Sequence, residues 1–383
     1  MIALFDPLAL VLAFFGYFLM FFLAGYVAPR VAYKLSGRFS LYTSMILLAA
    51  LIIFSFSGTL FLIFYFLNYY YNFGITEFSS LMLQIIILVI VSNVILYVFS
   101  PLLINWMYGV KEDKRVQKIV DKVAKKLNYR GKLKGVITTN FSLPNAFAYG
   151  NFIFGKYVAI SSGMLNLVNT KELEAVIGHE IGHHMHKDNV IMLLFGFLPS
   201  IIYFLGYSLI RSFSSSNNNE DSKANVILLI IGILAVAISF VIQILVLAFS
   251  RLREYFADLE GAKAAGKENM QSSLAKIHYY YEANLDSLNE IRESNTRMLF
   301  IYAFTQTFAN PFENLDNIFF EDSSEESEDN KEERKSEKTK TKINVDRNKI
   351  EELKKLKVSP FEEFLSTHPP IPKRLNFLDS LNF

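Results

Sequence analysis

The sequence has no cysteine among its 383 residues. Disulfide bonds and thiolate metal ligands are therefore excluded, and any metal must be held by histidine, aspartate or glutamate. Charge is also scarce: Asp, Glu, Lys and Arg make up 19% of the chain, and the formal net charge is +2. A chain without a large positive field has little attraction for a nucleic-acid backbone, so nucleic acid is not an expected partner.

Apolar side chains are abundant instead. The chain is 52% hydrophobic and 15% aromatic, which is too apolar for an ordinary soluble protein of this length. Uncharged runs recur that are long enough to cross a hydrocarbon core, which takes about 20 helical residues. We expect membrane spans at about 8–28, 43–67, 81–104, 189–210 and 225–249. The first of these is long and followed by basic residues, which predicts an uncleaved anchor and not a signal peptide.

The loops between these runs alternate in basic residues. The loop after the first span carries Arg30, Lys34 and Arg38 without an acid, and the segment after the third span carries eight basic residues between 111 and 130. The connections 68–80 and 211–223 have no such excess. By the positive-inside rule, the N-terminus lies outside and the segments next to the basic residues lie in the cytoplasm. We therefore expect a multi-pass protein of the cell membrane whose larger polar parts face the cytoplasm.

The cytoplasmic part comes from separate stretches of the chain. Segment 111–188 combines an amphipathic helix, Lys114–Lys126, with three expected strands and a further helix that Asn169 or Thr170 can cap. The expected strands are Gly135–Thr139, Asn145–Gly150 and Tyr157–Ser161. A helix is also expected from Arg251 to about Lys267, a helical stretch from Asn269, and a last amphipathic helix over about Asp346–Lys357. This mixture predicts an α+β domain beside the membrane spans.

The boundaries follow from these patterns. Stretch 321–345 is a run of Glu, Ser, Lys and Thr that cannot bury enough apolar area to fold, and we expect a disordered charged insert there. The expected divisions are an N-terminal membrane region with three spans, 1–110; the first part of the α+β domain, 111–188; a transmembrane hairpin, 189–250; the second part of that domain, 251–320; the insert, 321–345; and a C-terminal segment, 346–383.

An H-E-x-x-H pattern lies just before the hairpin. On a helix, His179 and His183 lie one turn apart on the same face, where their imidazoles can bind one zinc ion. Glu180 lies beside them and can take a proton from the attacking water. A zinc hydrolase needs a third protein ligand, and this ligand must come from elsewhere in the chain.

Other histidines offer few alternatives. His186 lies seven residues beyond His179, roughly 10 Å along a helix, so one ion is not expected to bind both. His184 points away from the zinc-binding face and is expected to be a polar surface or interface residue. The third zinc ligand is therefore expected to be an acidic side chain, His278 or His368.

An acidic pair, Glu254 and Asp258, follows the last span. At i and i+4 the two share one helix face, so one can bind zinc while the other orients a zinc-bound histidine. Alone, such a pair is ordinary in a helix, where Arg251 or Arg253 could bind it. His278, among tyrosines, is expected to be an ordinary helix residue.

The position of this pair in the chain favours a role in the site. His183 lies five residues before Asp188, where the fourth span begins, and Glu254 lies four residues after Ser250, where the fifth span ends. If both membrane helices continue into the cytoplasm, both side chains lie roughly 6–10 Å below the membrane surface. We therefore expect the H-E-x-x-H helix to be the cytoplasmic extension of a membrane helix.

Four separated motifs, in this order, resemble the HtpX family of membrane-bound zinc metalloendopeptidases, relatives of the CAAX-prenyl metalloproteases. They are Asn145–Ala148 (Asn-Ala-Phe-Ala), Gly178–His183 (Gly-His-Glu-Ile-Gly-His), Ser250–Asp258 and Ser366–Arg374. The resemblance covers most of the chain and implies a zincin-like (gluzincin) catalytic domain on a multi-pass helical membrane protein. The extra span before the catalytic domain and the charged insert depart from the bacterial members.

The resemblance also implies roles for single residues. It implies one Zn²⁺ per subunit, bound by His179, His183 and Glu254, with Glu180 as the catalytic base. Asp258 would not bind the zinc ion itself but would orient a zinc-bound histidine. Arg374 would help to close the site, and His368 would stabilise the oxyanion. The edge strand beside the cleft would contain Asn145, Ala146, Phe147 and Ala148.

The implied activity is cleavage of misfolded or damaged membrane proteins at the cytoplasmic face, a task of proteolytic quality control. The expected partners are unfolded or membrane-protein substrates and the lipid bilayer. The main alternative is a CAAX-prenyl-type membrane metalloprotease, which would need a larger chamber and more spans. An intramembrane protease is disfavoured by the charges beside the motif, such as Lys171 and Lys187, and a zinc transporter by the lack of ionisable residues in the spans.

Overall fold

The computed structural model describes residues 38–72, 74–141, 143–215, 222–284, 345–357 and 368–381. Within these ranges, four helices are long and apolar enough to cross a membrane: α3 (Arg38–Tyr71), α4 (Ile75–Met107), α8 (Asp188–Ser215) and α9 (Ser222–Ala265). Each contains one of the spans expected from the sequence. The span expected at 8–28 and the charged insert, apart from Val345, lie outside the described residues.

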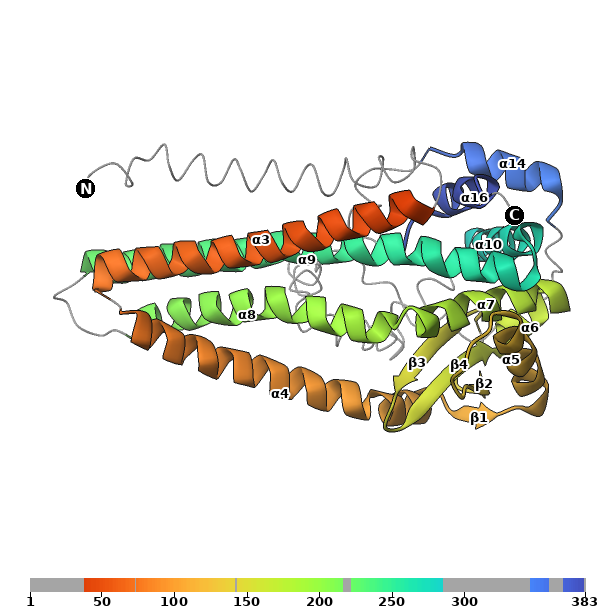
Figure 1. Cartoon of the computed structure of the whole chain (residues 1–383), viewed down its shortest axis with the longest axis horizontal. Helices are drawn as coiled ribbons and strands as arrows, with labels where there is room; N and C mark the ends of the chain where they lie inside the picture. Colours follow the sequence, from red (N-terminus) through yellow and green to blue (C-terminus); the bar gives the residue numbers. More distant parts are fainter. Residues whose placement is uncertain are drawn as a thin grey trace, which may run out of the picture.

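The four long helices run side by side, and the strands and shorter helices gather at one end (Figure 1). One cluster of buried side chains joins all four, with Ile52 of α3 and Val89 of α4 beside Leu205 of α8 and Leu245 of α9. The outward faces of α3 and α4 remain apolar: Phe61 is 66% exposed and Leu83 58%. Helices that are hydrophobic on all sides are typical of membrane spans, because their outer faces meet lipid.

A four-stranded sheet forms the centre of the polar end. The strands are β1 (Val110–Glu112), β2 (Lys134–Thr138), β3 (Ala146–Asn151) and β4 (Gly155–Ser161), in the order β1-β2-β4-β3. Strand β4 pairs parallel to β2 and antiparallel to β3, so β3 is an edge strand. The sequence predicted β2, β3 and β4 within a residue or two. It did not predict β1, because three residues carry no readable alternation.

Helices α5 (Lys114–Lys126) and α7 (Thr170–Met185) pack with this sheet, and a short helix, α6 (Ser162–Leu167), leads from β4 towards α7. Val120 of α5, Ile160 of β4 and Ile177 of α7 are fully buried in one cluster. The remaining described helices, α10 (Lys267–Ala283), α14 (Arg347–Lys355) and α16 (Ile371–Asp379), form a second cluster with the lower part of α9.

The H-E-x-x-H helix corrects one expectation. Helix α7 begins at a capping box between Asn169 and Glu172 and ends at Met185, and α8 begins only at Asp188. Lys187 between them has φ of 55°, a conformation that breaks a helix. The motif helix is therefore not a continuation of the fourth span. Helix α9, in contrast, continues without a break through Glu254 to Ala265.

Helix α7 packs closely against the C-terminal part of α9. A Cβ atom at Gly178 would lie 2.5 Å from Cβ of Ala264, and one at Gly182 would lie 3.1 Å from Cα of Ala257. Only glycine permits this approach at Gly178, because a distance under 3.0 Å leaves no room for a methyl group. The two glycines of the motif thus bring its histidines within reach of α9.

Candidate metal centre

His179 and His183 project from α7 towards each other. Their Nε2 atoms lie 3.2 Å apart, and the two rings are nearly perpendicular, at 88°. His179 is buried, and the side chain of His183 is 18% exposed.

Helix α9 brings Glu254 to the same point. Its two carboxylate oxygens lie 3.6 Å from Nε2 of His179 and 3.6 Å from Nε2 of His183. The candidate ligand atoms of the three residues all lie within 4.8 Å of one another. Oε2 of Glu254 is buried and has no hydrogen bond among the described residues.

This geometry fits a tetrahedral metal ion. Ligand atoms at about 2.0–2.1 Å from zinc, at tetrahedral angles, lie about 3.3 Å from one another. The observed separations of 3.2 and 3.6 Å are close to that value. Two imidazoles, one carboxylate and no thiolate are also the donor set of a catalytic zinc site, which keeps its fourth position open.

The other nitrogen of His179 is held by Asp258, one turn beyond Glu254 on α9. Nδ1 of His179 lies 3.0 Å from Oδ1 of Asp258, which is completely buried. Arg374 of α16 donates from Nε and from its terminal nitrogen to the two oxygens of Asp258, at 2.8 and 2.5 Å. Burial lowers the pKa of His179, but the neighbouring carboxylates of Asp258 and Glu254 outweigh it and raise this pKa to about 10.

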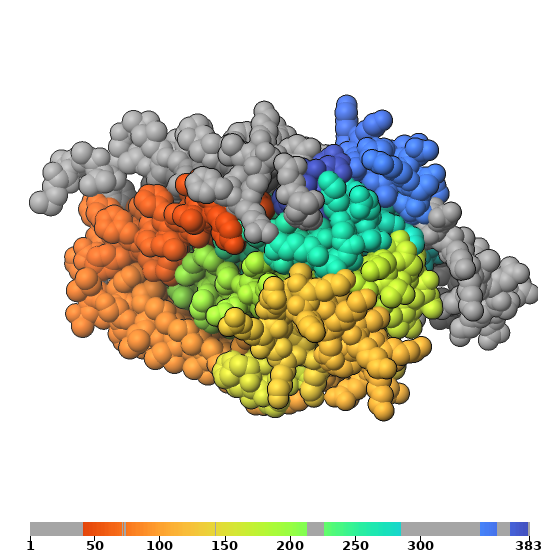
Figure 2. Space-filling view, turned by 45° about the vertical axis from the view of Figure 1, so that its right-hand side comes forward, coloured from red at the N-terminus to blue at the C-terminus, as the bar shows by residue number. Residues whose placement is uncertain are grey.

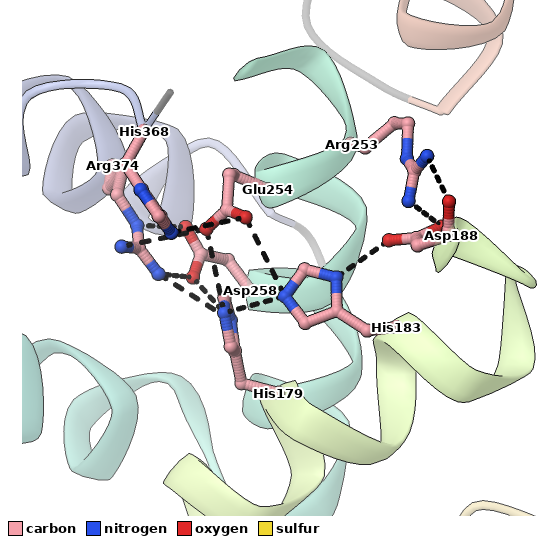
Figure 3. A network of polar contacts seen from close by, with 8 residues as sticks. All are labelled: His179, His183, Asp188, Arg253, Glu254, Asp258, His368 and Arg374. Carbon is pink, nitrogen blue, oxygen red and sulfur yellow. Dashed lines mark hydrogen bonds and ion pairs between the residues drawn. The ribbon is translucent and has the colours of Figure 1, made fainter. Parts of the chain in front are cut away.

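His183 has a matching support that the sequence did not reveal (Figure 3). Its Nδ1 lies 2.6 Å from Oδ2 of Asp188, the first residue of α8. The other oxygen of Asp188 lies 2.5 Å from a terminal nitrogen of Arg253, which also donates to the Asp188 carbonyl oxygen at 2.9 Å. Asp188 was expected only to begin the fourth span, and Arg253 only to pair with an acid on its own helix.

Glu180 lies next to His179 on α7 and is 7% exposed. No described residue forms a hydrogen bond or ion pair with its carboxylate, so its oxygens remain open to a water or a substrate. Its negative charge acts to raise the pKa of His183, although burial lowers that pKa more strongly.

The C-terminal motif reaches the centre from the far end of the chain. Nε2 of His368 lies 3.6 Å from Oε1 of Glu254, and 62% of the His368 side chain is exposed. Arg374 lies further inside, with its Nη1 3.9 Å from Oε2 of Glu254. The structure therefore brings His179, His183, Glu254 and the C-terminal pair into one cluster (Figure 3).

The remaining histidines lie outside this cluster. His184 lies buried where α7 meets the sheet, which is the second of the two expected positions, surface or interface: burial lowers its pKa to about 4, and its Nε2 lies 2.9 Å from the Tyr157 carbonyl oxygen. The neutral ring thus donates to β4 and fastens α7 to the sheet. His186 faces Glu260 and Phe256 on α9, and His278 is a residue of α10 beside Glu282.

The expected edge-strand residues lie in and just before β3. Ala146, Phe147 and Ala148 belong to the strand, and the Asn145 backbone precedes it, hydrogen-bonded to Ser161. Strand β3 pairs only with β4 in the described sheet and contacts α7, so it can accept another strand near the metal centre.

The sequence of this chain matches a known family of peptidases. Residues 110–382 match the model of peptidase family M48, and the chain belongs to that family.

Within the family, the chain is similar to HtpX proteases of archaea. It is 47% identical to the "Protease HtpX homolog" of Pyrobaculum aerophilum over the full length of both chains. It is 45% identical to that of Archaeoglobus fulgidus, over 100% of this chain and 99% of the other. The crystal structure of S. mikatae Ste24p matches with a TM-score of 0.44 and 18% identity, and covers 88% of this chain and 66% of that one.

Proposed function

We propose that this membrane peptidase is a zinc-dependent endopeptidase with one Zn²⁺ per chain, bound by His179, His183 and Glu254. The observation that carries the proposal is the convergence of these three side chains within 4.8 Å, beside the open carboxylate of Glu180. Zinc in such a site polarises the scissile carbonyl group and lowers the pKa of a water molecule.

Four side chains of this protein have separate roles in the proposed reaction. Glu180 accepts a proton from the attacking water and passes it to the leaving amine. His368, exposed at the rim of the site, donates to the oxygen that gains negative charge as the carbonyl carbon is attacked. Asp258 and Arg374 hold His179 in the tautomer that leaves Nε2 free to bind metal.

The substrate is an extended polypeptide at the membrane surface. Strand β3 offers its open edge to a substrate backbone, and pairing of this kind recognises main chain more than side chains. Broad specificity follows, which suits clearance of misfolded or damaged membrane proteins. The basic loops favour a cytoplasmic catalytic domain, made of 111–188 and 251–320 and closed by 346–383, with the N-terminus outside.

The decisive variant is Glu180→Gln in the purified, detergent-solubilised protein. It keeps the size of the side chain and removes the base, so cleavage of casein or of an unfolded membrane protein should fall by about a hundredfold or more. Zinc content should stay near that of the unchanged protein.

Glu174→Gln, six residues earlier on α7, is the matched control and should keep most of the activity. Wild-type rates in Glu180→Gln would exclude Glu180 as the base. Full activity after complete removal of metal by a chelator would exclude the zinc mechanism as a whole.

A further inference from the structure

The turn between β3 and β4 exposes large apolar side chains. Phe152 is 84% exposed and Ile153 51%, and no charged residue lies between Tyr149 and Gly155. Gly155 closes the turn with φ of 96°, as is usual after a three-residue hairpin loop. The hairpin therefore ends in a small, uncharged, apolar tip, defined here as Phe152–Phe154.

Strand β3 runs along the last three turns of the membrane helix α4. The rings of Phe147 and Tyr108 lie 5.2 Å apart, and the Tyr149 hydroxyl lies 2.5 Å from Oδ1 of Asn105. Asn151, at the end of the strand, reaches the carbonyl oxygens of residues 97 and 98 at 2.9 Å. Four residues of strand span about 13 Å, and ten residues of helix span about 15 Å, so the strand follows the helix axis.

A proline explains why Asn151 binds at this level. Pro101 lies inside α4 and has no N–H, so the carbonyl oxygen of Tyr97 loses its helical donor. Nδ2 of Asn151 donates to that oxygen and to the oxygen of Val98. Oδ1 of Asn151 accepts from the backbone N–H groups of residues 153 and 154. One buried side chain thus fastens the hairpin turn to the membrane helix.

With the hydrocarbon core centred on α4, this contact would lie at the edge of the core. Helix α4 has 33 residues centred on Val91, and the hydrocarbon core takes about 20 of them, or roughly 81–101. The tip lies beside Phe99, whose ring is 6.0 Å from that of Phe154, and Phe99 is itself 53% exposed. Figure 1 shows the β3–β4 turn beside α4, and Figure 2 shows the yellow strand region bordering the orange helix.

We propose that the β3–β4 hairpin tip, fastened by Asn151 to the Pro101 level of α4, inserts Phe152 and Ile153 into the acyl chains of the adjacent leaflet. The occupant of this surface is lipid, because the apolar tip is continuous with the lipid-facing side of a membrane helix. The edge strand beside the metal centre is then anchored in the bilayer at its far end, and a substrate paired with β3 lies along a path that starts in the membrane. This inference does not depend on zinc or on catalysis.

The protein has a single tryptophan, Trp106, which makes a fluorescence test direct. Phe152→Trp in a Trp106→Phe background is reconstituted, as the full chain, into phosphatidylcholine vesicles with or without lipids brominated on the acyl chains. Bromine quenches tryptophan on contact, so we expect at least a twofold loss of emission from position 152. Phe99→Trp in the same background serves as the positive control. Leu356→Trp, on the C-terminal side of α14 and 53% exposed, should not be quenched.

Quenching at 99 without quenching at 152 would overturn the proposal, whether solvent or another part of the chain covers the tip. A second variant tests the tether. Asn151→Ala should at least halve the quenching at 152 and leave quenching at 99 unchanged. Ser100→Ala removes only the Ser100 hydroxyl bond to the same Tyr97 oxygen, 2.9 Å long, and should change neither. Unaltered quenching at 152 in Asn151→Ala would overturn the assignment of Asn151 as the tether.

Discussion

The two histidines of the candidate metal centre are held by two different pairs of side chains, called the two arms here. In the first arm, Asp258 and Arg374 hold His179 and join α7, α9 and α16, segments that are up to 195 residues apart. In the second arm, Asp188 and Arg253 hold His183 at the junction of α7, α8 and α9. Both place a carboxylate on Nδ1 and an arginine behind it.

The arms differ in burial and in what completes them. Asp258 is fully buried and bound through both oxygens by one guanidinium, so it depends on the docking of the C-terminal helix. Asp188 begins α8, where the helix dipole favours a negative charge, and its arginine lies on the neighbouring helix of the membrane hairpin. The first arm is therefore complete only when α16 is docked, because α16 supplies Arg374. The second arm is complete when α8 and α9 are packed together, because they supply Asp188 and Arg253. The Nδ1 atom of His179 is thus held by residues distant in the sequence, and that of His183 by Asp188, only five residues away.

Replacement of Glu254, which lies against both histidines, should have the largest effect. Glu254→Gln replaces a charged ligand by a neutral amide, and zinc affinity should fall by more than the 10–100-fold typical of outer partners. Zinc content after dialysis at fixed free zinc measures this. Glu260→Gln, six residues later on α9, is the control and should stay loaded. Normal zinc content in Glu254→Gln would mean that Glu254 is not a ligand.

Asp258→Asn breaks the first arm and should be next in size. It leaves Arg374 buried without its carboxylate, which costs about 3–5 kcal/mol of unfolding free energy, and zinc affinity should fall about 100-fold. Thermal unfolding and chelator competition measure the two effects. The double variant Asp258→Asn with Arg374→Met should regain stability and not affinity. If it regains both, Asp258 serves packing and not His179.

Asp188→Asn breaks the second arm and should be milder. The asparagine oxygen can still accept from Nδ1–H of His183, and the side chain of His183 is 18% exposed, against 9% for His179. We expect about a tenfold loss of zinc affinity, together with a change in the visible spectrum of the Co²⁺-substituted protein. A loss as large as that of Asp258→Asn would mean that the two arms are equivalent.

The smallest effect concerns a carboxylate outside both arms. Burial raises the pKa of Glu174 on α7, but hydrogen bonds from Lys122 and Lys126 of α5 outweigh it and hold the pKa below its ordinary value. Because the folded-state pKa is lowered, the pair stabilises the protein above the unfolded-state pKa, about 4.3, and this contribution is lost as pH falls through the lower folded value. Glu174→Gln should lower the unfolding temperature at pH 7 by a few degrees, and the difference should shrink steadily below pH 4. A constant difference would assign the effect to packing.

The sequence predicted the parts of the centre that depend on local spacing. His179, Glu180 and His183 follow from one helical turn, and the structure places Glu254 and Asp258 on one helix face because α9 continues unbroken. The choice of Glu254 over Asp258 rested on family resemblance, since i and i+4 spacing alone treats them alike.

The rest depended on features that residue types do not reveal. Lys187 has a positive φ although lysine gives no sign of it, so the break that turns Asp188 towards His183 was invisible. Helix α16 was missed because three prolines at 369, 370 and 372 obscure its start. For His184 the sequence left surface and interface open, because a polar residue beside a metal motif gives no hint of a carbonyl group on a strand 27 residues earlier.

The break at Lys187 also has a mechanical consequence. Helix α9 is a rod of 44 residues, and Glu254 lies about 25 Å along it from the middle of the expected span. A tilt of 1° about that point moves the carboxylate by about 0.4 Å, twice the roughly 0.2 Å tolerance of a metal–ligand bond. Helix α7 is packed onto α9 at Gly178 and Gly182 and jointed to α8 at Lys187. A tilt of α9 that carries α7 with it would therefore leave the distances between the proposed ligands unchanged.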